Sequence, residues 1–176
     1  PSTQALAAAF ARSCAARKSV TAKHTSTTAP ASTSGAATQA LVKLHLAGMH
    51  ANSPACSVHA FDLDKLRQPG VTFWSGWDGD EIAVMGAPKR IDTTNGEIKS
   101  MRVSGAYLGK GAGRAMLEHI VAESRRMGIT RLWLETGSTD AFTPALKLYE
   151  SAGFEVCGPF ADYTLDPFSV FMRRDL

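Results

Sequence analysis

The sequence is poor in cysteine, and its few cysteines do not form a recognisable site. Cys14, Cys56 and Cys157 are odd in number and lie far apart along the chain. This spacing fits neither a structural zinc site nor a disulfide framework. We therefore expect no metal, and the small number of thiols is typical of a reducing compartment.

Long apolar runs and internal repeats are also lacking. The apolar run at residues 5–11 is too short to cross a bilayer. No basic residue precedes it, as one would in a secretory signal. We therefore expect no membrane partner.

The first 36 positions lack acidic residues but carry four basic ones: Arg12, Arg17, Lys18 and Lys23. The segment is rich in Ala, Ser and Thr and ends in a low-complexity run at 25–35. Such a composition cannot bury a core, so residues 1–36 are predicted to form a disordered extension. The segment also resembles an organelle transit peptide, which leaves two locations open: the cytoplasm, or a mitochondrion or plastid.

The basic character of the chain resides in this extension. Removing its four basic residues from the formal net charge of +3 leaves about −1 for residues 37–176. A nucleic-acid-binding domain normally carries a basic face of its own, so we expect no nucleic-acid partner. Residues 37–176 are long enough for one domain with a sizeable core.

Hydrophobic periodicity and turn signals divide this domain into helices and strands. Helices are expected at 38–49, 62–67, 111–127 and 143–152, and strands at 71–77, 81–90, 97–103, 130–135 and 169–172. Hairpin turns are expected at Asp78-Gly79 and Asn95-Gly96. This order predicts an α/β (α+β) fold, a single domain with a mixed central β-sheet flanked by helices.

The most informative segment is a glycine-rich loop between the strand at 97–103 and the helix that follows. Gly109, Gly111 and Gly113 allow the backbone to take positive φ values and to approach a ligand closely. The first N–H groups of the next helix lack partners within that helix and point outward. Together these features predict a backbone site for a phosphate anion.

The spacing separates three types of phosphate loop. The Walker loop does not fit, because only three residues separate Gly105 from Gly109 and a glycine stands where Ser or Thr is required. The dinucleotide fingerprint G-x-G-x-x-G fits at Gly109 and Gly111, with Glu135 near the place of its acid, but Arg114 replaces its third glycine. A Rossmann-type nucleotide binder stays open as an alternative.

The third type is an acyl-CoA loop, and a second motif supports it. Leu108-Gly-Lys-Gly-Ala-Gly113 matches the loop Gln/Arg-x-x-Gly-x-Gly/Ala except at its first position. Ala145-Leu-Lys-Leu-Tyr-Glu-Ser-Ala-Gly-Phe154 matches the signature Ala-x-x-Leu-Tyr-x-x-x-Gly-Phe. In this order the two motifs resemble the GNAT superfamily of N-acetyltransferases over residues 96–176. Residues 37–95 agree with it only in the order of elements.

The resemblance implies an enzyme that moves an acetyl group from acetyl-CoA to a primary amine by direct attack in a ternary complex. It implies two sets of donor contacts: a phosphate loop of Leu108, Gly109, Lys110, Gly111, Ala112, Gly113 and Arg114, and strand backbone of Met101, Arg102 and Val103 along the pantetheine arm. Leu108 and Phe142 depart from the family pattern and lack its usual donor-contacting side chains. The alternative is therefore a non-catalytic CoA-binding or regulatory module with the same fold.

The resemblance also implies the catalytic residues. Tyr149 is the candidate acid, because the tyrosine of the family lies near the donor sulfur, and a phenol can protonate a departing thiolate. Glu97 is the candidate base, on a strand that the family places near the acceptor amine. Regular alternation puts Glu97 on one face with Lys99, Met101 and Val103, whereas the bulge common in the family breaks this parity.

The acceptor site is expected near Glu135, which ends a strand, and near the aromatic pair Phe160 and Tyr163. A protein N-terminus, a lysine, a small amine and an amino acid all stay open as acceptors. Further candidates lie in the same segments or near the end of the first helix: Asp162, Asp166, His45, His50 and Asn52. Trp74 and Trp77 fit either a homodimer interface or a half-buried strand.

Overall fold

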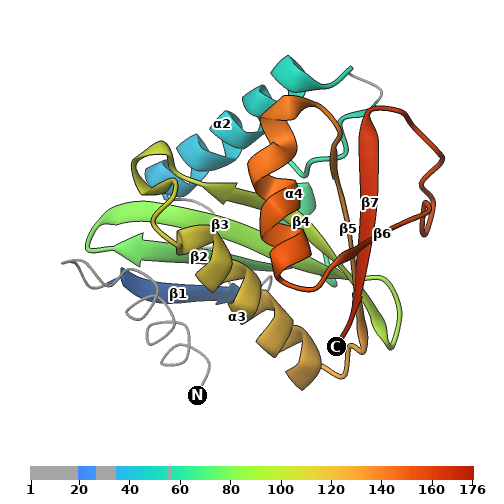
Figure 1. The fold of residues 1–176 in the computed structure, drawn as a ribbon. Helices are drawn as coiled ribbons and strands as arrows, with labels where there is room; N and C mark the ends of the chain where they lie inside the picture. Colours follow the sequence, from blue (N-terminus) through green and yellow to red (C-terminus); the bar gives the residue numbers. More distant parts are fainter. Residues whose placement is uncertain (1–19, 27–34, 55–56) are drawn as a thin grey trace.

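The computed structural model describes residues 20–26, 35–54 and 57–176, with side chains from residue 35 onward. A seven-stranded β-sheet forms its centre, and helices cover both faces (Figure 1). The strands are β1 (Val20–Ser26), β2 (Thr72–Asp78), β3 (Glu81–Arg90), β4 (Asn95–Val103), β5 (Arg131–Gly137), β6 (Glu155–Cys157) and β7 (Ser169–Asp175). The α-helices are α2 (Ala36–Asn52), α3 (Ala112–Arg126) and α4 (Thr143–Ser151), and the 3-10 turns are η2 (Lys65–Arg67), η3 (Gly105–Tyr107) and η4 (Asp140–Phe142).

The strand order across the sheet is β1-β2-β3-β4-β5-β7-β6. β4 and β5 run parallel and are joined by α3, whereas the other neighbouring strands are antiparallel. This arrangement confirms the mixed sheet flanked by helices. Among the described residues, no helix is long and apolar enough to span a membrane.

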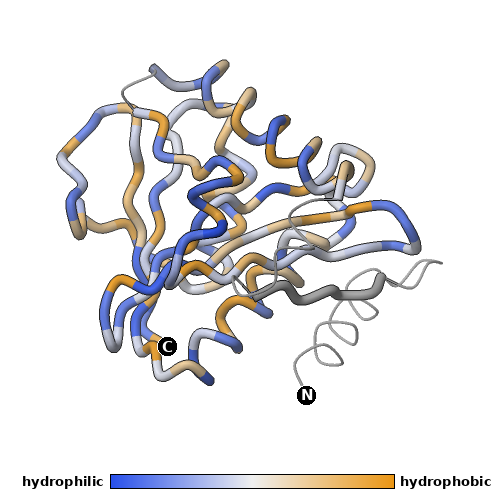
Figure 2. Tube along the Cα trace, turned by 180° about the vertical axis from the view of Figure 1, so that it is seen from behind, coloured by the Kyte–Doolittle hydropathy of each residue, from blue (hydrophilic) through white to orange (hydrophobic). Residues whose placement is uncertain are grey.

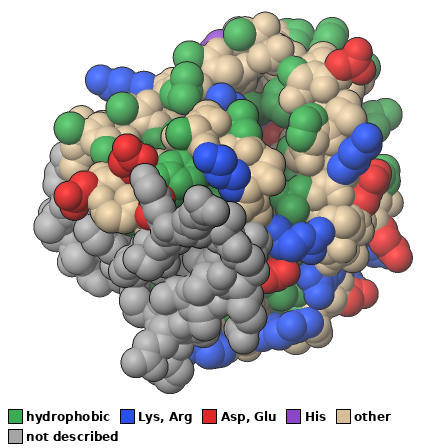
Figure 3. Space-filling model, turned by 60° about the vertical axis from the view of Figure 1, so that its left-hand side comes forward, with side chains coloured by type: hydrophobic (Ala, Val, Ile, Leu, Met, Phe, Trp, Pro, Cys, Tyr) green, Lys and Arg blue, Asp and Glu red, His purple; other side chains and the backbone are tan. Residues whose placement is uncertain are grey.

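Two hydrophobic clusters hold the helices to opposite faces of the sheet. The larger cluster lies under α3 and α4 and includes Met116, Ile120 and Leu134. The smaller one lies under α2 and includes Leu41, Phe73 and other buried side chains. Figure 2 shows α3 alternating between hydrophobic and hydrophilic positions, as expected for a helix with one buried side. In the view of Figure 3, basic and acidic side chains are interspersed.

The parallel pairing of β4 with β5 is short. It joins Asn95–Ile98 to Arg131–Leu134 and ends there, although both strands continue. The remainder of β4 and the end of β5 therefore separate and leave backbone groups of both strands available along the opening. We call this region the splay: residues 99–103 of β4 facing residues 135–137 of β5.

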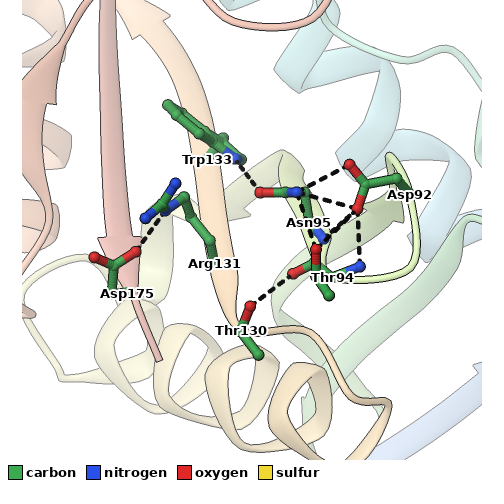
Figure 4. Close-up of polar contacts among 7 residues, drawn as sticks. All are labelled: Asp92, Thr94, Asn95, Thr130, Arg131, Trp133 and Asp175. Atoms are coloured by element: carbon green, nitrogen blue, oxygen red, sulfur yellow. Dashed lines mark hydrogen bonds and ion pairs between the residues drawn. The ribbon is translucent and has the colours of Figure 1, made fainter.

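Side chains fix the opposite, closed end of this strand pair (Figure 4). Asp92 accepts hydrogen bonds from the backbone N–H groups of Thr94 and Asn95, both at 2.8 Å, and so closes the β3–β4 turn. Asn95 Oδ1 then accepts a hydrogen bond from the indole of Trp133 in β5 at 3.0 Å. The turn therefore lies at residues 91–94, which corrects the expectation of a turn at Asn95-Gly96.

A β-bulge changes the face that β4 presents. The register between β3 and β4 shifts between Met85 and Ala87, and Ser100 has a φ of +53°. Met101 and Val103 consequently pack against the cluster under α3 together with Ile98. Glu97 and Lys99 point to the other face, so the bulge, and not regular alternation, describes this strand.

Residues 20–26 correct part of the expected disordered extension, because they form β1 and pair with the whole of β2. An edge strand needs only backbone hydrogen bonds and no hydrophobic core of its own, so the composition argument does not apply to it. Residues 1–19 and 27–34 lie outside the described residues, as does the transit-peptide prediction. Trp74 is 2% exposed and packs in the core at 4.1 Å from the ring of His119, which removes it as an interface residue.

Gly137, at the end of β5, has no room for a side chain, since a Cβ there would overlap the ring of Phe142. We expect Gly137→Ala to lower the free energy of unfolding by roughly 1–3 kcal/mol, because the ring must move. Gly158→Ala is the control, because a Cβ at that position meets nothing within 4 Å. Urea unfolding measures both, and equal midpoints for the two variants would contradict the crowding at Gly137.

Candidate functional site

The glycine loop adopts the geometry of an anion site. Gly109 and Gly111 have φ values of +70° and +83°, and Gly111 is the N-cap of α3. The first hydrogen bond within α3 joins the N–H of Ala115 to the carbonyl of Gly111 at 3.0 Å. The amides of residues 112–114 precede that bond and have no acceptor within the helix. They point outward at the positive end of the helix dipole.

The loop is held close to the splay. A Cβ on Gly113 would lie 3.1 Å from Val103 in β4 and 3.3 Å from Leu148 in α4. The missing side chain therefore lets the start of α3 approach both elements. The loop therefore lies beside residues 101–103 of β4, a stretch that borders β3 but no longer pairs with β5.

The charged side chains of the loop have contacts of their own. Arg114 donates a hydrogen bond to Ser151 of α4 and lies 3.9 Å from Glu118. Lys110 Nζ lies 5.6 Å from the centre of the Tyr107 ring. Leu108, where the family usually has a polar residue, is 65% exposed. The backbone amides are thus the part of the loop best placed for phosphate.

Tyr149 lies on the α3 and α4 side of the sheet, buried beside Phe154 with ring centres 5.9 Å apart. Burial raises the pKa of its phenol well above the usual value, and the carboxylate of Glu135 raises it further. The hydroxyl therefore keeps its proton at neutral pH, as an acid must.

Glu97 lies on the opposite side of the sheet in a buried polar cluster. Its carboxylate, 3% exposed, pairs with Lys99 Nζ at 2.8 Å and accepts a hydrogen bond from the Tyr163 hydroxyl at 2.6 Å. Lys99 also donates to the Tyr163 oxygen and to the carbonyl of His59. Burial, together with Glu97, raises the pKa of the Tyr163 phenol. Each polar atom named here is therefore already engaged.

Glu135 lies at the splay, one residue beyond Leu134, the last residue of β5 that pairs with β4. Its carboxylate is partly buried and accepts a hydrogen bond from Ser169 Oγ at 2.7 Å. Burial raises its pKa, and this effect exceeds the lowering by the Ser169 hydrogen bond and by nearby His59 and Lys99. Glu135 is the acid whose charge reaches both tyrosines, Tyr149 and Tyr163.

The expected aromatic pair lines the same side of the sheet as Glu97. Phe160 stacks on Trp133 at 5.2 Å and lies 4.9 Å from the ring of Tyr163. Of the two acids in this loop, Asp162 is exposed. Asp166 is tied to its own loop, where hydrogen bonds from Ser57 and from the backbone of Phe168 lower its pKa.

The residues near the end of α2 do not converge. His45 is buried against the sheet, and burial, with the neighbouring Arg102, lowers its pKa to about 4. His50 and Asn52 are exposed on the helix, where Asn52 bonds the carbonyl of Gly48. In the described part of the chain, no group of three or more His, Cys, Asp and Glu side chains could hold a metal.

Sequence reasoning missed two side chains of this region. Lys99 completes the cluster with Glu97, and the guanidinium of Arg102 lies against Gly48 of α2. Arg102 was expected to act through its backbone alone. The bulge at Ser100 turns its side chain to the α2 face, and a shift of register within a strand leaves no clear signal in the sequence.

The chain is similar in sequence to known N-acetyltransferases. A model of the acetyltransferase (GNAT) family matches residues 38–154. The chain is 55% identical over 136 residues to the uncharacterized N-acetyltransferase YsnE of Bacillus subtilis, and the aligned region covers 77% of this chain and 90% of YsnE. It is 48% identical over 140 residues to the uncharacterized N-acetyltransferase YedL of Escherichia coli K12, and the aligned region covers 80% of this chain and 88% of YedL.

Solved structures share the fold. An acetyltransferase from Streptococcus agalactiae has a TM-score of 0.66 at 17% identity and covers 89% of this chain and 98% of its own. A GNAT family acetyltransferase from Elizabethkingia anophelis with acetyl-CoA bound has a TM-score of 0.57 at 14% identity, covering 91% and 100%. Fold, motifs and sequence relatives agree: the chain belongs to the acetyltransferase (GNAT) family and is an acyltransferase.

Proposed function

We propose that this chain transfers an acetyl group from acetyl-CoA directly to a primary amine while both substrates are bound. The observation that carries the proposal is the splay. β4 and β5 separate next to the glycine loop, and a buried, protonated tyrosine and a half-buried carboxylate border the same opening.

The donor would lie along the glycine loop and the adjacent stretch of β4. The amides of Ala112, Gly113 and Arg114 would hold its phosphates at the start of α3. Backbone groups of residues 101–103 that point toward the splay, where β4 no longer pairs with β5, would hold the pantetheine arm, and an N–H in this stretch would polarise the thioester carbonyl. These contacts use backbone atoms, so the departure at Leu108 leaves them intact.

Amide formation requires a neutral amine. For an amine with a pKa of about 10.4, reaching the neutral form at pH 7 costs about 4.6 kcal/mol. A carboxylate near the amine accepts the ammonium proton, directly or through a water, before the nitrogen lone pair attacks the thioester carbonyl. As the C–S bond breaks, Tyr149 gives its proton to the departing thiolate, which has a thiol pKa of about 8.5. The nitrogen then loses its second proton, through water, and the phenol regains one, so that the amide, the thiol and the protonated tyrosine result.

We assign the proton acceptor to Glu135, with Glu97 as the second candidate. Glu97 is bound to Lys99 and Tyr163, and protonating it would leave Lys99 buried without its counter-charge. Glu135 accepts a hydrogen bond from Ser169 and has no ion-pair partner among the described residues, and its raised pKa makes it a better base than an ordinary carboxylate. In this arrangement Glu97 positions the acceptor side of the site.

The loop is tested by Gly111→Val. A β-branched residue strains a backbone held at φ +83° and covers the amides at the start of α3, so we expect acetyl-CoA affinity to fall at least tenfold in calorimetry. Gly128→Ala is the matched control, because Gly128 follows the other end of α3 with a φ of +79° and has space around its Cβ position. Equal losses of affinity in both variants would indicate a general loss of structure instead.

The acid is tested by Tyr149→Phe. Removing the hydroxyl keeps the packing against Phe154, so we expect the affinity for acetyl-CoA to remain while kcat for thiol release falls about 10²-fold. Binding is followed by calorimetry and thiol release over a panel of amines. An unchanged kcat would exclude Tyr149 as the acid, and donor binding without release from any amine in the wild type would favour the non-catalytic module.

The base is tested by comparing Glu135→Gln with Glu97→Gln. Because the pKa of Glu135 is raised above its ordinary 4.5, the acid limb of kcat/KM is expected above pH 4.5 and should vanish in Glu135→Gln. The charged form of Glu135 is disfavoured in the fold, so the wild type loses stability as pH rises through 4.5 toward the folded pKa. Glu135→Gln should therefore be more stable than the wild type at neutral pH but not at pH 3.

Glu97→Gln should instead lower stability, by roughly 3–5 kcal/mol, because it leaves Lys99 unpaired. Thermal unfolding between pH 3 and 8 and pH–rate profiles separate the two residues. An acid limb that persists in Glu135→Gln and disappears in Glu97→Gln would return the role of base to Glu97.

A further inference from the structure

The side chain of Arg102 is partly buried, and its guanidinium forms no ion pair with any residue that the structure describes. Its Nε is buried and, among the described residues, has no hydrogen-bond partner. The described ion pairs involve other side chains. A buried charge without a partner is costly, which is why such charges in proteins normally meet an opposite charge.

The helix against which Arg102 lies, α2, offers it no acid. Its Nη1 lies 3.2 Å from where a Cβ on Gly48 would stand, so the guanidinium lies on α2. α2 has no acidic residue, and the first acid of the whole sequence is Asp62. Residues 1–19, 27–34 and 55–56, which the structure does not describe, therefore contain no Asp or Glu either. His45, the titratable neighbour on α2, is neutral because its pKa is lowered to about 4.

The position of Arg102 separates it from the donor site. The start of α3 packs on the other face of β4, where Val103 meets Gly113. Arg102 shares the α2 face with Lys99, which lies over Phe61 at 5.2 Å, and Phe61 packs against the cluster under α2. Glu97 and its partner Tyr163 lie on this same face, which is the side assigned above to the acceptor.

We infer that Arg102 binds a carboxylate of the acceptor, so that the acceptor is an amine that also carries a carboxylate, of the amino-acid class. The inference rests on the proposed function, since it requires an amine acceptor. A guanidinium presents two parallel N–H donors that match the two oxygens of a carboxylate. The bulge at Ser100 provides this side chain, because without it residue 102 would project to the α3 face.

The test uses the full chain, acetyl-CoA, and a panel of free L-amino acids paired with their C-terminal amides, which differ only in the carboxylate. We expect at least one free amino acid to release thiol with a kcat/KM tenfold or more above that of its amide. In Arg102→Gln the ratio of acid to amide should fall to about one, because the KM for the free amino acid rises. Arg102→Lys should retain part of this preference, because lysine keeps the positive charge but lacks the two parallel N–H donors of the guanidinium.

Arg125→Gln is the control. It removes an exposed arginine about 20 Å from the start of α3, at its other end, and should leave the ratio of acid to amide unchanged. Thermal unfolding shows whether each variant is folded. If Arg102→Gln does not fold, Arg102→Lys takes its place in the test. A phosphate-binding role would appear as an equal loss for acids and amides together with weaker acetyl-CoA binding, and it would overturn the inference.

Three further results would overturn it: amides that react as well as acids, an acid-to-amide ratio that survives in Arg102→Gln, or release from no amino acid while acetyl-CoA binds. Failure of the proposed function is distinguishable, because the wild type would then not bind acetyl-CoA in calorimetry, or would bind it without release from any amine. If the proposed function fails in this way, the inference about Arg102 fails as well.

Discussion

The short parallel pairing of β4 with β5 is the constraint on which the rest of the site depends. Four residue pairs hold the strands together, and the hydrogen bond between Trp133 and Asn95 fixes their closed end. Because that end is pinned, the separation at the other end is a permanent part of the fold. Backbone N–H and C=O groups that would be hydrogen-bonded in a longer ladder therefore stay available to a ligand.

The bulge in β4 determines which of its side chains point to each face of the sheet. Met101 and Val103 join the core under α3, where Tyr149 is buried, while Glu97, Lys99 and Arg102 turn toward α2. One strand therefore borders both the side proposed for the donor and the side proposed for the acceptor. Glu135 lies where these sides meet, since its charge acts on Tyr149 and on Tyr163.

Much of the fold could be predicted because local signals were strong. The glycine loop, the periodic α3 and the Thr143-Pro144 start of α4 each depend on neighbours in sequence, and the structure has all three elements within a residue or two of the expected bounds. The bulge at Ser100 and the pairing of β1 with β2 depend on long-range packing and backbone hydrogen bonds. For the same reason the sequence pointed to Glu97 and to Tyr163 separately, but not to the buried Lys99 that contacts both, and it offered only the backbone of Arg102.

The antiparallel ladder between β1 and β2 makes the N-terminal segment the edge strand of the sheet in place of β2. All seven residues of β2 are paired by Val20–Ser26. A chain cleaved after Ser26 would leave the N–H and C=O groups of β2 as an open template, free to add a strand from a second molecule. Cleavage after Ser26 would thus turn β2 into the edge strand, whereas cleavage before Val20 would leave β2 paired with β1.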